Sequence, residues 1–218
     1  MTKKRTAILI SGRGANMAAL IEAAKSPDYP AQISLVISNV ETAAGLTRAH
    51  ANNIPALVID HRQFGKDRQA FEAAIQDQLE RHDIEIVCLA GFLRLFTPWL
   101  VSRWSGRMIN MHPALLPSFK GMHACEQALA AGVKIHGASV HFVVPEVDSG
   151  PIVAQAAVPV LDNDTADTLA ARVLAAELRL YPMALGLVAS SKAQLIGDQV
   201  RNAVAVKSDA DFFVPGLK

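Results

Sequence analysis

Hydrophobic residues occur along the first half of the chain in short runs. Four runs, at 6–10, 33–38, 56–59 and 84–90, precede a fifth that leads into Asn110. The run at 6–10 is uninterrupted, as is typical of a central parallel strand buried on both faces. The segments between them have helical spacing and predict helices over 17–25, 43–51, 66–82 and 99–104. This alternation predicts right-handed crossovers and a single doubly wound, mostly parallel α/β sheet with helices on both faces.

The pattern changes after residue 121. A helix is predicted over 122–131, and two apolar runs, 138–144 and 152–158, are predicted as adjacent strands. The connection between these runs, 145–150, contains Asp and Gly, which favour turns. We expect this pair to extend the sheet with mixed strand direction.

The C-terminal part is predicted to begin with a long helix. Thr165 offers a cap for a helix running towards Ser190, and Pro182 is expected to kink or break it. Two short strands are expected after Gln194, the second over 199–206. The last ten residues, 209–218, are expected to be mobile.

Composition and charge narrow the classes of protein. A length of 218 residues suits one α/β domain. A formal net charge of +1 produces no electrostatic field strong enough to indicate a nucleic-acid or membrane partner. The apolar run at 6–10 is too short for a signal peptide or a spanning helix, so we expect a cytoplasmic protein. The two cysteines, Cys88 and Cys125, lack a CxxC spacing and predict free thiols, with no metal cluster.

The strongest candidate chemistry lies where the fifth strand ends. Asn110 and His112 alternate along the strand, so both side chains should project from one face, and Pro113 ends sheet pairing. An amide donor and a protonated imidazole suit a reaction in which a carbonyl oxygen gains negative charge. A strand that simply ends in polar residues is the alternative.

Two further segments are candidates for ligand binding or catalysis. The loop 11–16 between the first strand and helix can direct backbone N–H groups at a phosphate, although its glycines equally suit a tight turn. Asp148 lies in the 145–150 turn. If that turn folds over the sheet edge, its carboxylate would favour the imidazolium form of His112; otherwise Asp148 is an ordinary turn residue.

Four motifs in matching order resemble one family. The segments 10–16, 89–95, 109–121 and 136–143 are similar to those of the phosphoribosylglycinamide formyltransferase family, and the similarity runs from about Thr6 to Ala189. It implies a Rossmann-like fold and transfer of a formyl group from 10-formyltetrahydrofolate, a co-substrate, to the amine of glycinamide ribonucleotide in purine synthesis, without a metal. It also implies one domain over 1–218, with a nucleotide-binding half to about 105, a catalytic and folate-binding half over about 106–195, and a tail.

The resemblance also assigns residues. It implies that Asn110, His112 and Asp148 are catalytic, with direct attack of the amine on the formyl carbon and stabilisation of the resulting oxyanion. The residues implied to contact the ribonucleotide are Gly14, Ala15, Asn16 and Glu177, and those implied to contact the folate are Arg68, Leu93, Arg94, Leu95, Phe96, Asn110, Val144, Pro145, Glu146, Val147 and Asp148. The alternatives from the residues alone are a Glu177 paired with Arg or Lys on a helix surface, a solvated Arg68, and core positions for Leu93, Leu95 and Phe96.

Several other residues have open interpretations. His141 is a core strand histidine or a partner of the site, and His123 is expected near the cleft. Cys125 stands where family members often carry a histidine, and a cis Leu116–Pro117 bond is expected from the resemblance.

Rival functions fit less well. A metal hydrolase using His112, His123, His136, His141 and Asp148 lacks a compact ligand spacing. A non-catalytic nucleotide-binding module leaves Asn110 and His112 unexplained. A formyltransferase acting on tRNA, or a formyltetrahydrofolate hydrolase, is expected to carry a further domain. We expect small-molecule partners and a monomer or homodimer.

Overall fold

A computed structural model of the chain describes residues 2–202. The elements in chain order are β1 (Lys4–Ile10), α1 (Ala15–Ala24), β2 (Ala31–Ser38), α2 (Ala44–Ala51), β3 (Ala56–Val58), the 3₁₀ turn η1 (His61–Phe64), α3 (Arg68–Arg81), β4 (Ile86–Leu89), α4 (Pro98–Arg103), β5 (Met108–His112), α5 (Ala124–Ala130), β6 (Ile135–Phe142), β7 (Ile152–Pro159), α6 (Ala166–Ala189), β8 (Ala193–Ile196) and β9 (Gln199–Asn202).

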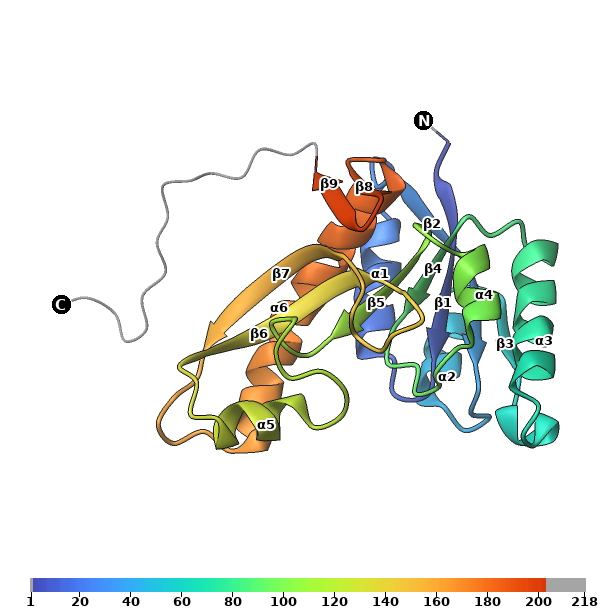
Figure 1. Cartoon of the computed structure of the whole chain (residues 1–218). Coiled ribbons are helices and arrows are strands. Elements are labelled where there is room, and N and C mark those ends of the chain that lie inside the picture. The colour runs from blue at the N-terminus through green and yellow to red at the C-terminus, as the bar shows by residue number, and fades with distance from the viewer. Residues whose placement is uncertain (1, 203–218) are drawn as a thin grey trace.

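Seven strands form one sheet in the order β3-β2-β1-β4-β5-β6-β7 (Figure 1). The pairs from β3 to β5 are parallel, whereas β6 runs antiparallel to β5 and to β7. The mostly parallel doubly wound sheet with mixed C-terminal strands is therefore confirmed. The final two strands, β8 and β9, form a separate antiparallel hairpin rather than joining this sheet.

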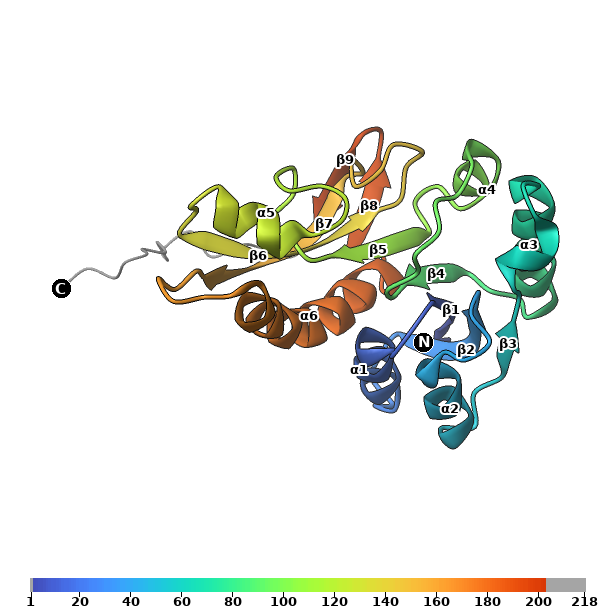
Figure 2. The same cartoon turned by 90° about the horizontal axis from the view of Figure 1, so that it is seen from below.

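Two apolar layers sandwich the sheet, because its central strands are buried on both faces. On one face, side chains such as Ile8 and Ile109 pack against α1, α2, α5 and α6, including the fully buried Tyr181. On the other face, Leu9 and Val87 pack against α3 and α4. Figure 2 shows α1, α2 and α6 below the sheet and α3 and α4 above it. Helices on both faces leave the carboxyl edge of the parallel strands for ligands.

The helix boundaries have local causes. The carboxylate of Asp67 accepts a hydrogen bond from Ala70 N–H, so α3 begins at Arg68 rather than at Lys66. A reciprocal capping box between Thr165 and Thr168 starts α6.

The expectation that Pro182 breaks α6 is wrong. The helix continues through it to Ala189, and Tyr181, Ala184 and Leu185 around it are fully buried. Packing of this apolar face offsets the one backbone hydrogen bond that proline cannot donate.

The predicted tail is only partly within the described chain. The two short strands after the long helix are present, and the second is described as Gln199–Asn202. Positions 203–206 of the predicted strand, and the stretch 209–218 expected to be mobile, lie outside the described residues. Within residues 2–202, no helix combines the length and the apolar character that crossing a bilayer would require.

Candidate active site

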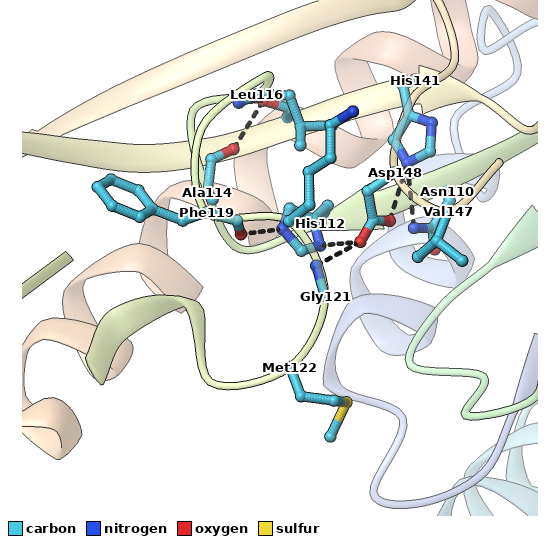
Figure 3. Close-up of polar contacts among 12 residues, drawn as sticks. Asn110, His112, Ala114, Leu116, Phe119, Gly121, Met122, His141, Val147 and Asp148 are labelled. Atoms are coloured by element: carbon cyan, nitrogen blue, oxygen red, sulfur yellow. Dashed lines mark hydrogen bonds and ion pairs between the residues drawn. The ribbon is translucent and has the colours of Figure 1, made fainter. Parts of the chain in front are cut away.

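The end of β5 presents His112 to two oxygen atoms. Its Nδ1 lies 3.3 Å from Asp148 Oδ2, and its Nε2 lies 2.9 Å from the carbonyl oxygen of Phe119 (Figure 3). The ring is buried. Because both ring nitrogens face acceptors, the imidazolium form, which has two N–H donors, satisfies both contacts.

Asp148 joins the site from the turn between β6 and β7. Its Oδ2 accepts a hydrogen bond of 2.9 Å from Gly121 N–H, and its Oδ1 lies 3.6 Å from His141 Nε2. Burial on its own raises the pKa of this carboxyl. The contacts with His141 and Gly121 and the charge of His112 outweigh burial, so the pKa of Asp148 lies below its ordinary value.

The turn that carries Asp148 is tightly constrained. Asp148 itself adopts a left-handed conformation with φ of 48°. A Cβ atom on Gly150 would lie 1.7 Å from the carbonyl oxygen of Phe142, so only glycine fits there. Sequence and packing therefore fold this turn back over the sheet edge, which the pattern of residues 145–150 alone did not show.

His141 fixes the orientation of Asn110. The antiparallel register sets these residues opposite each other, and Asn110 Nδ2 lies 3.2 Å from His141 Nε2. His141 Nδ1 lies 2.9 Å from the Phe142 carbonyl oxygen, so the ring is held between this carbonyl, the Asn110 amide and the Asp148 carboxylate. His141 is thus both a buried strand histidine and a partner of the site. The two interpretations left open by the sequence therefore both hold.

Two residues that the sequence analysis did not single out hold the turn after β5. Ser139 Oγ donates to the Ala114 carbonyl at 2.7 Å and accepts from Leu116 N–H at 3.0 Å. Gln155 Nε2 donates to the Leu116 carbonyl at 3.0 Å. The Leu116–Pro117 peptide is cis, as expected. These contacts fix the turn that leads to the Phe119 carbonyl.

The loop 11–16, called the glycine loop below, lies at the carboxyl end of β1. Gly14 caps α1 with φ of 71°, and a Cβ there would lie 3.1 Å from Gly45 Cα. The first N–H groups of α1, from Ala15 onwards, have no partner within the helix and suit an anion.

Glu177 extends this loop from α6. Its Oε2 accepts a hydrogen bond of 2.6 Å from Asn16 Nδ2. Burial raises the pKa of Glu177, and the Asn16 hydrogen bond offsets this only in part. The alternative of a surface glutamate paired with Arg or Lys is therefore wrong. Asn16 Oδ1 is also buried and lacks a hydrogen-bond partner among residues 2–202.

The residues predicted to contact a folate lie on exposed loops. Leu93 and Leu95 expose 68% and 63% of their surface, so the core alternative is wrong for both. Phe96 is buried and stacks on Phe92 with ring centroids 5.3 Å apart. Arg68 is exposed, and its Nη2 donates to the Leu95 carbonyl at 2.6 Å.

The second loop of this set surrounds Asp148. Val147 is 43% exposed, Pro145 and Glu146 are also exposed, and Val144 is half-buried. Arg94, on the first loop, is exposed as well. Exposed apolar side chains on both loops form a surface against which a flat heterocycle can pack.

Two further residues discussed in the sequence analysis are His123 and Cys125. The His123 side chain is exposed and lies 3.1 Å from Glu126, so it does not join His112. Cys125 is buried, with Sγ 3.9 Å from His136 Nε2. In the described part of the chain, no three His, Cys, Asp or Glu side chains gather as a metal site would require.

A cavity of about 460 Å³ opens beside the Asp148 turn. Its walls come from three segments of the chain: Leu116–Lys120, Asp148–Ile152 and the β8–β9 hairpin tip at 198–200. The cavity therefore adjoins the Asp148 turn on the side of the hairpin.

The fold and site together define an α/β enzyme with an amide, an imidazole and a carboxylate converging at the carboxyl edge of its sheet. The sequence model of the family described as formyl transferase matches residues 4–185. The chain belongs to the formyl transferase family.

Individual relatives agree with this membership. The chain is 39% identical over 182 residues to a phosphoribosylglycinamide formyltransferase of Haemophilus influenzae, covering 84% of this chain and 85% of that protein. It is 50% identical over 193 residues to the human trifunctional purine biosynthetic protein adenosine-3, covering 88% of this chain but only 19% of that protein. The crystal structure of glycinamide ribonucleotide transformylase 1 from Symbiobacterium toebii superimposes with a TM-score of 0.88 at 41% identity, covering 92% of this chain and 94% of that chain.

Proposed function

We propose that the protein transfers the formyl group of 10-formyltetrahydrofolate to the amine of N1-(5-phospho-D-ribosyl)glycinamide. The products are the N2-formyl ribonucleotide and tetrahydrofolate, in de novo purine (IMP) biosynthesis. The observation that carries this proposal is the convergence of Asn110, His112 and Asp148, with His112 Nδ1 3.3 Å from the Asp148 carboxylate. Membership of the formyl transferase family and the names of the relatives support the choice of substrates.

In this reaction the substrate amine attacks the formyl carbon directly. A bond forms between the amine nitrogen and the formyl carbon, and the formyl oxygen becomes an oxyanion. Asn110, whose amide His141 orients, donates a hydrogen bond to this oxygen, and the His112 imidazolium supplies positive charge beside it. A donor of this kind typically contributes on the order of a hundredfold or more in rate.

Collapse of the adduct breaks the bond between the formyl carbon and N10 of the folate. The amine loses one proton overall and N10 gains one. Asp148 balances the imidazolium charge and passes the proton through water, which the adjoining cavity of about 460 Å³ can hold.

The remaining predicted residues divide between the two substrates. The N–H groups of Gly14, Ala15 and Asn16 hold the ribonucleotide phosphate at the start of α1. The Glu177 carboxylate accepts a hydrogen bond from the same ligand. The pterin packs between the exposed loops 93–96 and 144–148, and Arg68 faces the folate carboxylate.

One assay tests the proposal. Release of tetrahydrofolate is measured from 10-formyltetrahydrofolate with and without the ribonucleotide. We expect release only when the ribonucleotide is present. Equal release in its absence indicates hydrolysis and contradicts the proposal. His112→Ala should lower turnover at saturating substrates by about a hundredfold or more.

The proposal also covers location and assembly. We propose a cytoplasmic enzyme that acts on two small molecules as a monomer or homodimer. Sedimentation velocity distinguishes these two states, and a larger assembly would contradict this part of the proposal.

A further inference from the structure

A chain of polar contacts runs along the carboxyl edge of the sheet and crosses the ends of four neighbouring strands. Ser11 follows β1, Asn39 follows β2, His61 follows β3 and Leu93 follows β4. Leu93 N–H donates to Ser11 Oγ at 2.8 Å, and Ser11 Oγ–H donates to Asn39 Oδ1 at 2.6 Å. Asn39 Nδ2 then lies 3.2 Å from His61 Nδ1. The chain follows the strand order β4-β1-β2-β3 within the sheet.

Ser11 is the central member of this chain. Its hydroxyl accepts one hydrogen bond and donates another, so the hydrogen bonds point the same way and polarise one another. Its backbone N–H also donates to the Gly91 carbonyl at 3.0 Å, at the start of the loop that carries Leu93. Asn39 is 3% exposed, so loss of the serine hydroxyl would leave a buried amide oxygen without this donor.

The two segments that Ser11 joins have different tasks in the proposed function. Ser11 is the first residue of the glycine loop, 11–16, and the loop from Gly91 to Phe96 displays Leu93 and Leu95 to solvent. Although 68% of Leu93 is exposed, its backbone N–H is held by the Ser11 hydroxyl. Ser11 therefore fixes the backbone of a loop whose side chains are free to contact a ligand.

We propose that Ser11 is a positioning residue that sets the spacing between the glycine loop and the 91–96 loop. This inference rests on the proposed function, in which the first loop binds the ribonucleotide and the second binds the folate. The attacking amine and the formyl carbon must approach to about 3–3.5 Å before reaction. A shift of either loop therefore misplaces one reactant with respect to the other.

Substitutions at Ser11 separate the hydroxyl from the volume of the side chain. Ser11→Ala removes the hydroxyl, Ser11→Cys keeps the volume but bonds weakly, and Ser11→Thr keeps the hydroxyl. Exposed Ser105→Ala is the matched control. We expect Ser11→Ala and Ser11→Cys to lower kcat at least fivefold, because the reactants are misplaced, with both KM values changed less than kcat. Ser11→Thr and Ser105→Ala should stay within twofold of wild type.

If Ser11→Ala and Ser11→Cys keep kcat within fivefold of wild type, the inference is overturned, even if their melting temperatures fall. If Ser11→Ala does not fold, Ser11→Cys alone decides the outcome.

Hydrogen exchange gives a second readout that does not depend on activity. We expect the Leu93 amide of the wild-type protein to be protected, and to exchange at least tenfold faster in Ser11→Ala. Equal exchange in both proteins overturns the inference. If the wild-type protein transfers no formyl group, the proposed function fails, and the exchange measurement still tests the hydrogen bond itself.

Discussion

Replacement of Asp148 by asparagine should slow the reaction without removing the side chain. Asparagine has nearly the same shape, so the turn and the contact with Gly121 N–H at 2.9 Å can persist. The negative charge beside His112 is lost. At the separation of 3.3 Å, Coulomb's law with an effective dielectric constant of about 20 gives about 5 kcal/mol between the two charges.

Part of this energy is retained, because the asparagine oxygen still accepts a hydrogen bond and water enters from the adjoining cavity. A loss of about 4 kcal/mol corresponds to a decrease in kcat of about a thousandfold. The measurement is kcat at saturating concentrations of both substrates. Asp162→Asn, which neutralises a carboxylate whose side chain is 97% exposed, is the matched control and should stay within twofold of wild type. A kcat for Asp148→Asn within tenfold of wild type would refute the reasoning.

Further predictions follow from the same contacts. The pKa of Asp148 is lowered in the folded protein, so its carboxylate stabilises the fold above the ordinary value of 3.8, and this contribution is lost as the pH falls below it. In urea titrations from pH 6 to pH 3, the free energy of unfolding of Asp148→Asn should therefore fall less than that of wild type. An equal fall in the two proteins would contradict this. Burial disfavours the charged form of the Glu177 carboxyl, so Glu177→Gln should raise the melting temperature at pH 7. The same variant should raise KM for the ribonucleotide about tenfold or more through loss of a charged hydrogen bond. An unchanged KM would exclude contact between Glu177 and the ribonucleotide. Gly14→Ala forces a side chain into a left-handed conformation and should lower the free energy of unfolding by about 1–2 kcal/mol, as measured by urea denaturation. His141→Phe keeps the ring volume but releases the Asn110 amide, so kcat should fall about tenfold with KM nearly unchanged, and a purely KM effect would argue against this role.

The parallel part of the fold could be predicted because its signals are local. Short apolar runs such as 6–10 and 84–90 are typical of strands covered on both faces, and β1 and β4 are such strands. Helical spacing likewise predicted α3, and the N-cap at Thr165 predicted α6. The break expected at Pro182 is absent because burial of residues such as Tyr181 and Leu185, which depends on distant strands, outweighs the local rule about proline.

The candidate site likewise has features that could be predicted from the sequence and features that could not. The alternation of Asn110 and His112 follows from strand geometry and could be predicted from the sequence. The place of His141 was left open between a core histidine and a partner of the site, because its contact with Asn110 depends on the register between β5 and β6. The burial of Glu177 beside Asn16 depends on the packing of α6 against α1, and these residues are far apart in the sequence. Contacts of this kind are set by tertiary structure, which no local pattern encodes.

The most direct test of the account follows the one-carbon group itself. 10-Formyltetrahydrofolate carrying ¹³C in the formyl group is mixed with the protein and the ribonucleotide, and the label is followed by NMR. The account predicts that the label moves to the amide of the formylated ribonucleotide in equal amount to the tetrahydrofolate released, with none on the protein. Label recovered as formate, or bound to the protein during turnover, would contradict direct transfer.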